Sequence, residues 1–270
     1  MRSIQPSIPA HDAEAQWYDS AWMSKYVEAR EIVARVAPDR LDEFVHGFDV
    51  LRVPADFSQR FVAGFVPPDL LETIRQEVRE IPRERLMHHE VEDFGRFVVQ
   101  HWPAFTALQA ELVDRVSELA GEPLEPTYNF LSMYTRMGVC QPHLDAPSSK
   151  WTLDICVDQS EEWPIWFSQV VPWPERREDI RRIDLAVIKS DRSLAFREEL
   201  LAPGDAVLFS GTNQWHYRDP LPRQAGRRFC DLLFFHYIPR GSRRLTQPKE
   251  WAALFGIPEL AAMPAIDIEY

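Results

Sequence analysis

A run of short apolar segments, separated by prolines and glycines, fills the second half of the chain and restricts its fold more than any other feature. The segments are rich in β-branched and aromatic residues, which favour strands, and the intervening prolines and glycines end them. We therefore expect strands at residues 127–136, 151–158, 164–171, 183–189, 205–210 and 227–238.

The first half of the chain carries a helical pattern instead. Apolar residues recur every three or four positions, Pro67-Pro68 precedes one such stretch, and Gly121 follows another. Proline suits the first turn of a helix and glycine suits the residue just after its end. We expect helices over residues 12–46, 69–80 and 104–120, with strands and turns over 47–65.

Helices followed by a run of strands predict an α+β protein that is mainly β, in which an N-terminal helical layer packs on a β-sandwich or barrel. We expect residues 1–122 to form the helical region, 123–245 the core, and 246–270 a C-terminal helix and tail. At 270 residues, these parts fit within one structural domain.

The charge excludes several classes of function. Lys and Arg number 30 against 42 Asp and Glu, so the net charge is −12. An acidic surface disfavours binding to phosphate backbones and anionic lipids, so we expect no nucleic-acid or membrane partner.

The sequence also lacks the common nucleotide-binding motifs. No G-x-G-x-x-G occurs and no glycine precedes a lysine, which removes the usual dinucleotide and P-loop motifs. The oligomeric state stays open.

Cysteine usage and the N-terminal sequence bear on the compartment. The three cysteines, Cys140, Cys156 and Cys230, are too few for a disulfide framework and are expected to be small core residues in a reducing compartment. No apolar signal segment opens the sequence, and no run of 18 apolar residues exists. A cytoplasmic location is expected.

The segment Gln141-Pro142-His143-Leu144-Asp145 carries the strongest chemical signal. In an extended chain, residues i and i+2 point to one face, so the imidazole of His143 and the carboxylate of Asp145 can hold the same metal ion. His216 follows the expected strand at 205–210 and a turn. Two histidines and one carboxylate from strand ends match the facial triad of non-heme Fe(II) oxygenases, which leaves other coordination positions open.

The surroundings of these residues extend the pattern. Tyr134 and Gly138 precede His143 as Y-x-x-x-G-x-x-x-x-H-x-D, and G-R-R-F begins at residue 226 before an apolar strand. With these motifs, residues 127–240 resemble the Fe(II)/2-oxoglutarate-dependent dioxygenase superfamily, and prolyl-hydroxylase-like members in particular. The resemblance implies a double-stranded β-helix (jelly-roll) core. It also implies that His143, Asp145 and His216 are the metal ligands and catalytic residues, with Fe(II), 2-oxoglutarate as cosubstrate, and O₂.

The resemblance further implies an arginine, on the strand after the second histidine, that binds the far carboxylate of 2-oxoglutarate. Arginine suits this role because its charge is permanent and its donors form a fork. Arg228 is the first candidate and Arg227 the rival, because neighbouring residues of a strand point to opposite faces of the sheet. Tyr134 is a candidate for the same carboxylate. Arg136 and Lys150 are further alternatives, although Lys150 is expected to be solvated.

The function implied is hydroxylation of a small molecule, such as an amino acid or a natural-product intermediate, with release of succinate and CO₂. Desaturation or cyclisation would use the same residues. Three alternatives stay open: an oxygenase acting on a protein or peptide side chain, a relative that uses the same triad without 2-oxoglutarate, and a non-catalytic cupin-like binding module. Residues 1–120 match no motif.

Other features have plainer interpretations. The aromatic residues Trp163, Trp166 and Phe167 are either pocket-lining or core residues. The charged segment His88-His89-Glu90 is expected to form a surface loop. His101 and His236 lie among apolar residues and are expected to be hydrogen-bonded core histidines.

Overall fold

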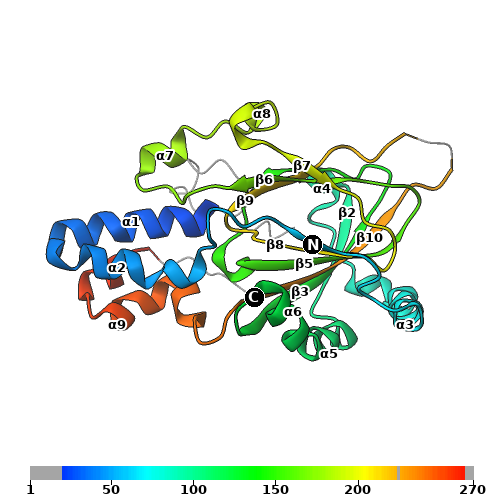
Figure 1. Ribbon diagram of the computed structural model, residues 1–270, viewed down its shortest axis with the longest axis horizontal. Helices are drawn as coiled ribbons and strands as arrows, with labels where there is room; N and C mark the ends of the chain where they lie inside the picture. The colour runs from blue at the N-terminus through cyan, green and yellow to red at the C-terminus, as the bar shows by residue number, and fades with distance from the viewer. Residues whose placement is uncertain (1–19, 224–225, 265–270) are drawn as a thin grey trace.

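Two antiparallel sheets form the centre of the molecule in the computed structural model, which describes residues 20–223 and 226–264 (Figure 1). The large sheet has the strand order β1-β8-β5-β10-β3-β2 and the small sheet the order β4-β9-β6-β7. The large sheet contains β1 (Arg60–Val62), β2 (Arg96–Gln100), β3 (Leu124–Tyr134), β5 (Trp151–Gln159), β8 (Ala206–Phe209) and β10 (Cys230–Pro239). The small sheet contains β4 (Cys140–His143), β6 (Ile165–Val170), β7 (Arg197–Glu199) and β9 (Gln214–Arg218).

From β3 onwards the chain passes repeatedly between the two sheets. β3, β5, β8 and β10 lie in the large sheet, and β4, β6, β7 and β9 lie in the small one. Strands far apart in the sequence therefore become neighbours, as when β10 pairs with both β3 and β5. This alternation brings inward-facing side chains of both sheets into one interior.

Helices α3, α5 and α6 cover the outer face of the large sheet (Figure 1). Leu71 and Ile74 of α3 belong to the same buried cluster as Leu153 and Ile155 of β5. Both faces of β5 are thus covered, which explains why its first seven residues are all buried. The helices of this layer are α3 (Pro68–Glu80), α5 (Pro103–Glu111) and α6 (Val113–Ala120).

A second layer of helices lies at one end of the sheets, where the N-terminal and C-terminal parts of the chain meet (Figure 1). The buried ring of Trp22 in α1 contacts Trp173 and Trp251 edge-on, each at 5.4 Å between ring centroids. Its indole nitrogen donates to the carbonyl of Thr246 at 2.9 Å. The layer contains α1 (Ser20–Val36), α2 (Leu41–Gly47) and α9 (Trp251–Phe255).

Short helices complete the connections between these elements. Three are α-helical: α4 (Val91–Phe94), α7 (Arg177–Arg181) and α8 (Leu185–Ile188). The others are 3-10 helices: η1 (Pro38–Arg40), η2 (Asp49–Leu51), η3 (Arg83–Arg85), η4 (Pro147–Ser149), η5 (Arg192–Leu194), η6 (Arg243–Thr246), η7 (Pro248–Glu250) and η8 (Pro258–Ala262). Within the described ranges, no helix combines the length and apolar character needed to cross a bilayer.

Most of the predicted elements are confirmed, and one is wrong. Residues 183–189, predicted as a strand, contain α8, because the Asp184 carboxylate accepts from the backbone N–H of Ala186 at 2.9 Å and caps a helix. Residues 12–19 of the first predicted helix lie outside the described residues. The sequence pattern missed β2, β4, β7 and β9, which have three to five residues each.

The boundaries 1–122, 123–245 and 246–270 stay a prediction. The first of these segments nevertheless does more than supply helices, because its strands β1 and β2 extend the two edges of the large sheet. The three cysteines are buried and free, as the sequence predicted.

Candidate active site

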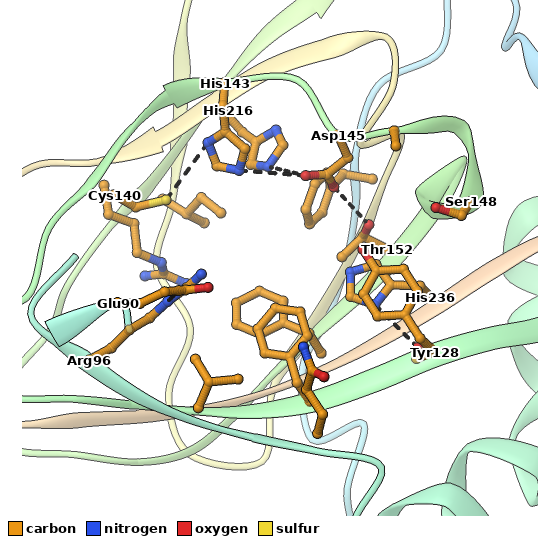
Figure 2. Close-up of a pocket in the computed structure, with 18 of the residues that line it drawn as sticks. Glu90, Arg96, Tyr128, Cys140, His143, Asp145, Ser148, Thr152, His216 and His236 are labelled. Atoms are coloured by element: carbon orange, nitrogen blue, oxygen red, sulfur yellow. Dashed lines mark hydrogen bonds and ion pairs between the residues drawn. The ribbon is translucent and has the colours of Figure 1, made fainter. Parts of the chain in front are cut away.

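His143, Asp145 and His216 come together in the interior between the two sheets (Figure 2). His143 ends β4 and pairs directly with His216 of β9, so the two imidazole rings lie 4.1 Å apart between centroids. The Oδ1 atom of Asp145 lies 3.5 Å from Nε2 of His143 and 3.8 Å from Nε2 of His216. One donor atom from each residue lies within 4.8 Å of the others, as binding of one metal ion requires.

Backbone carbonyls orient both histidines. Nδ1 of His143 lies 2.8 Å from the carbonyl oxygen of Gln141, and Nδ1 of His216 lies 2.9 Å from that of Gln214. A neutral ring that donates from Nδ1 presents the lone pair of Nε2, and both Nε2 atoms face Asp145. Two imidazole nitrogens and a carboxylate suit non-heme Fe(II), so the donor set fits that metal.

The carboxylate of Asp145 is held by the turn that precedes β9. The backbone N–H of Asp145 donates to the carbonyl of Gly211 at 2.9 Å, and the Thr152 hydroxyl lies 3.4 Å from Oδ2 of Asp145. A Cβ atom at position 211 would overlap Oδ2 of Asp145. Only glycine therefore lets this turn approach the carboxylate so closely.

Burial and mutual charge set the protonation of the three residues. Burial, followed by the neighbouring His143, lowers the pKa of His216 well below its ordinary value, so this ring stays neutral. Burial also acts to lower the pKa of His143, but Cys140 and Asp145 outweigh it and raise the pKa to about 9. A metal ion bound here would displace the proton of His143.

The three residues line a cavity of about 220 Å³ whose walls come from both sheets (Figure 2). Figure 2 places Glu90 and Arg96 on one side of it and Tyr128, His236 and Ser148 on the other. We call the first side, with Glu90, Arg96, Tyr134 and Arg218, the charged end, and the second side, with Tyr128, Phe130, Ser148, Phe234 and His236, the neutral end.

At the charged end, Arg96 is 6% exposed and begins β2. Its Nε atom donates to the carboxylate of Glu90, and its Nη1 atom donates to the hydroxyl of Tyr134 at 2.8 Å. The guanidinium also lies over the rings of Phe94 and Phe130, at 4.8 and 5.5 Å from their centroids. These contacts hold Arg96 in one position.

The second arginine of this end, Arg218, follows His216 by two residues on β9. It donates through Nη2 to Asp154 at 2.8 Å and through Nη1 to the carbonyl of Trp163. Asp154 is fully buried. Burial raises the pKa of Asp154, and the adjacent Arg218 opposes that rise.

The neutral end consists mainly of rings from β3 and β10. Tyr128 stacks on His236 at 4.0 Å with an interplanar angle of 7°, and Phe130 stacks on Phe234 at 4.9 Å. Burial lowers the pKa of His236 to about 3, so its imidazole is neutral at physiological pH. The hydroxyl of Ser148, a buried side chain, makes no hydrogen bond within the described residues.

The arginines predicted to bind the cosubstrate do not line this cavity. Arg227 is exposed and lies 4.9 Å over the ring of Phe229, and Arg228 donates to the carbonyl of Pro222 at 3.3 Å. The strand β10 begins only at Cys230, so the alternation that would turn Arg228 inward starts two residues too late. Their role therefore stays a prediction that their positions do not support, whereas Tyr134 does line the cavity.

The further alternatives for the cosubstrate also lie elsewhere. Arg136 is exposed. Lys150 is buried and contacts Glu122 at 2.5 Å and the carbonyl of Val50 at 2.7 Å, so the prediction that it is solvated is wrong. Burial lowers the pKa of Lys150, and Glu122 opposes that change. Trp163 and Phe167 are buried core residues outside the cavity lining.

Two predictions for histidine-containing segments need correction. Glu90, expected on a surface loop, is 7% exposed because Arg96 draws its carboxylate inward. His101, expected in the core, is exposed, with a positive φ of 50° just after β2. His236 is buried, and its Nδ1 lies 3.3 Å from the carbonyl of Tyr128, as predicted.

Sequence reasoning missed Arg96, Glu90 and Arg218. A signal existed for Arg218, because it follows His216 by two residues and a strand there would turn both to one face. The alternation in R-F-V-V-Q at residues 96–100 is too short to identify a strand, so nothing local pointed to Arg96.

Comparison with known proteins reveals relatives in structure. No family model matches the sequence, and no curated protein matches it significantly. The structure resembles HygX of Streptomyces hygroscopicus, solved with nickel, 2-oxoglutarate and hygromycin B bound, at 14% identity and a TM-score of 0.50 over 73% of this chain and 86% of that one. It also resembles SnoN, a non-heme α-ketoglutarate-dependent epimerase from nogalamycin biosynthesis, at 14% identity and a TM-score of 0.53 over 76% and 87%.

A third resemblance is to EctD from S. alaskensis in its apoform, at 10% identity and a TM-score of 0.50 over 70% of this chain and 74% of that one. The chain has the fold of Fe(II)/2-oxoglutarate-dependent enzymes. The resemblance noted in the sequence is thereby confirmed at the level of the fold. At these identities, the likeness concerns the fold alone.

Proposed function

We propose that the protein is a non-heme Fe(II)/2-oxoglutarate-dependent oxygenase that hydroxylates a small molecule and releases succinate and CO₂. The observation that carries the proposal is the convergence of His143, Asp145 and His216 in an interior cavity of a fold shared with such enzymes. In both histidines a backbone carbonyl holds Nδ1, and the opposite ring nitrogen, Nε2, faces the same carboxylate. This shared orientation argues against an incidental cluster.

The proposal includes the double-stranded β-helix core. Its eight strands would be β3 to β10, with β3, β10, β5 and β8 on one side and β4, β9, β6 and β7 on the other. In this arrangement β4 and β9 carry the three donor residues or lie next to them. The two added strands β1 and β2 extend the large sheet beyond the core.

In this function His143 and His216 would hold Fe(II) through Nε2, and Asp145 would hold it through its carboxylate. Bound Fe(II), with 2-oxoglutarate and O₂, supplies the oxidising chemistry. The protein orients the ligands through Gln141, Gln214 and Thr152, and its cavity walls limit the access of water. Because the three residues line the cavity, the cosubstrate and substrate would reach a metal ion held there from the cavity.

A small-molecule substrate agrees with the dimensions of the site. The cavity has a volume of about 220 Å³, and rings of β3 and β10 line its neutral end. The solved structure of HygX holds hygromycin B, and SnoN belongs to nogalamycin biosynthesis. Both support a natural-product intermediate over a protein side chain as the class of substrate.

The test is anaerobic addition of Fe(II) and then 2-oxoglutarate to the purified protein, followed by visible absorbance. We expect the weak visible band that an Fe(II)–2-oxoglutarate complex produces. Admission of O₂ together with a pool of small metabolites should then yield succinate and an oxidised metabolite by mass spectrometry. A protein that binds Fe(II) but never alters 2-oxoglutarate would be a binding module, and the proposal would fail.

A further inference from the structure

The geometry points to Arg96, on a strand outside the eight core strands, as the residue that binds the far carboxylate of 2-oxoglutarate, with Tyr134 as its partner and Glu90 as its positioning residue. The inference rests on the proposed function but departs from its sequence-based form, in which Arg228 has this role. It assigns part of the active site to the N-terminal segment of the chain.

The first support is the pairing of two strands. Arg96 of β2 and Tyr134 of β3 are direct partners in the large sheet, so their side chains leave the sheet side by side. Both line the cavity, and both are almost fully buried.

The second support is the hydrogen bonding of Tyr134. Its hydroxyl accepts from Nη1 of Arg96 at 2.8 Å, and a phenol hydroxyl that accepts one hydrogen bond still has its own hydrogen to donate. Within the described residues, that hydrogen finds no acceptor. A carboxylate beside Tyr134 would accept from this hydroxyl and from the guanidinium together, which gives a charge-assisted pair of hydrogen bonds.

The third support is the role of Glu90. Its carboxylate binds Arg96 at Nε, away from the Nη1 atom that faces Tyr134. Burying a guanidinium without a counter-charge is costly, so Glu90 keeps Arg96 inside the protein before any cosubstrate binds. Glu90 thereby holds the guanidinium beside Tyr134.

Arg218 is the competing residue, and its contacts argue for a structural role. Its Nη1 and Nη2 atoms donate to the carbonyl of Trp163 and to Asp154, which are fixed acceptors of the protein itself. The Nη1 partner of Arg96, in contrast, is a hydroxyl that can turn its hydrogen to a new acceptor. The cosubstrate could join Arg96 and Tyr134 without breaking a buried ion pair.

The experiment compares two cosubstrates on Fe(II)-loaded protein under anaerobic conditions. 2-Oxoglutarate carries the far carboxylate, and 2-oxopentanoate has the same chain length without it. The main variant is the double substitution Arg96→Gln with Glu90→Gln, which avoids leaving the Glu90 charge buried alone. Tyr134→Phe is the second variant, because it keeps the ring, and Arg228→Ala is the matched control.

We expect the double variant to bind 2-oxoglutarate at least about 100-fold more weakly. The far carboxylate of the cosubstrate would lose the buried guanidinium that balances its charge. Tyr134→Phe should weaken it about tenfold. Neither variant should change the affinity for 2-oxopentanoate or the retention of Fe(II). Arg228→Ala should leave both cosubstrates unaffected.

Other results would overturn the inference in distinguishable ways. If Arg228→Ala carries the loss, the anchor is on the segment before β10 and the proposed function survives. If the double variant loses affinity for both cosubstrates equally, its effect is structural. If Tyr134→Phe then binds 2-oxoglutarate as tightly as the wild type, the carboxylate site at Arg96 and Tyr134 is excluded. If the wild-type protein binds neither cosubstrate, the proposed function itself fails.

Discussion

The two ends of the cavity keep polar side chains in the protein interior in different ways. At the charged end, each arginine is matched by a carboxylate, Arg96 by Glu90 and Arg218 by Asp154. At the neutral end the side chains are rings and a serine hydroxyl, and the one titratable imidazole, His236, is kept uncharged by burial. Under the inference above, the charged end binds an anion of fixed geometry, whereas the neutral end selects by shape and a few hydrogen bonds.

The largest effect is expected where the two ends meet, at the metal site. His143→Ala, Asp145→Ala and His216→Ala should each abolish retention of Fe(II), because each removes one of the three proposed donor atoms. Metal content after anaerobic desalting measures this. His88→Ala, an exposed histidine outside the cavity lining, is the control. Full Fe(II) content in any of the three alanine variants would contradict the assignment.

A large loss of stability is expected from breaking the Arg218–Asp154 pair. Asp154→Ala leaves a buried guanidinium without its counter-charge, so the free energy of unfolding should fall by about 3–5 kcal/mol. Denaturant unfolding measures the change. The double variant Arg218→Met with Asp154→Leu should recover most of it, since it leaves no stranded charge. A single variant as stable as wild type would mean that the charged end contributes nothing to folding.

A pH-dependent effect is expected from His236 at the neutral end. The pKa of this imidazole is about 3 in the folded protein, below the ordinary value of 6.5 that applies when the chain is unfolded. The unfolded chain therefore takes up a proton below pH 6.5 that the folded protein refuses, and stability falls as the pH drops toward 3. His236→Phe keeps the ring stack and removes this titration.

Thermal unfolding from pH 7.5 to 4.5 checks this expectation. The melting temperature of the His236→Phe variant should decline less with acid than that of the wild type. Parallel declines would mean that His236 accepts a proton in the folded state, and the neutral end would then be able to hold a charge.

The smallest effect is expected from Ser148→Ala. Among residues 20–223 and 226–264, the buried Ser148 hydroxyl has no hydrogen-bond partner, so its removal should change the free energy of unfolding by no more than about 1 kcal/mol, toward greater stability. Denaturant unfolding of Ser148→Ala and Asp154→Ala in parallel compares the loss of stability at the two ends. A loss above about 2 kcal/mol would show that the hydroxyl is satisfied in the folded protein.

Local patterns were sufficient where the candidate ligands lie close together in the sequence. The spacing of His143 and Asp145 indicated a shared metal site even though β4 ends at His143, and a third candidate ligand just after a predicted strand could be found by its residue type. The short strands β2 and β9 were not recognised, because five residues carry too little periodicity. The capping of α8 by Asp184 likewise outweighed the apolar run that had suggested a strand there.

The sequence by itself determined the candidate metal ligands, the strand-rich second half and the helices before it, since each depends on residue type, spacing or periodicity within short segments. Only the tertiary structure decided which arginines reach the cavity. Arg96 meets Tyr134 because β2 pairs with β3 across 38 residues, and Arg228 misses the cavity because β10 begins after it. Alternation fixes which face a residue takes along its own strand, but the choice of neighbouring strand depends on packing of the whole sheet.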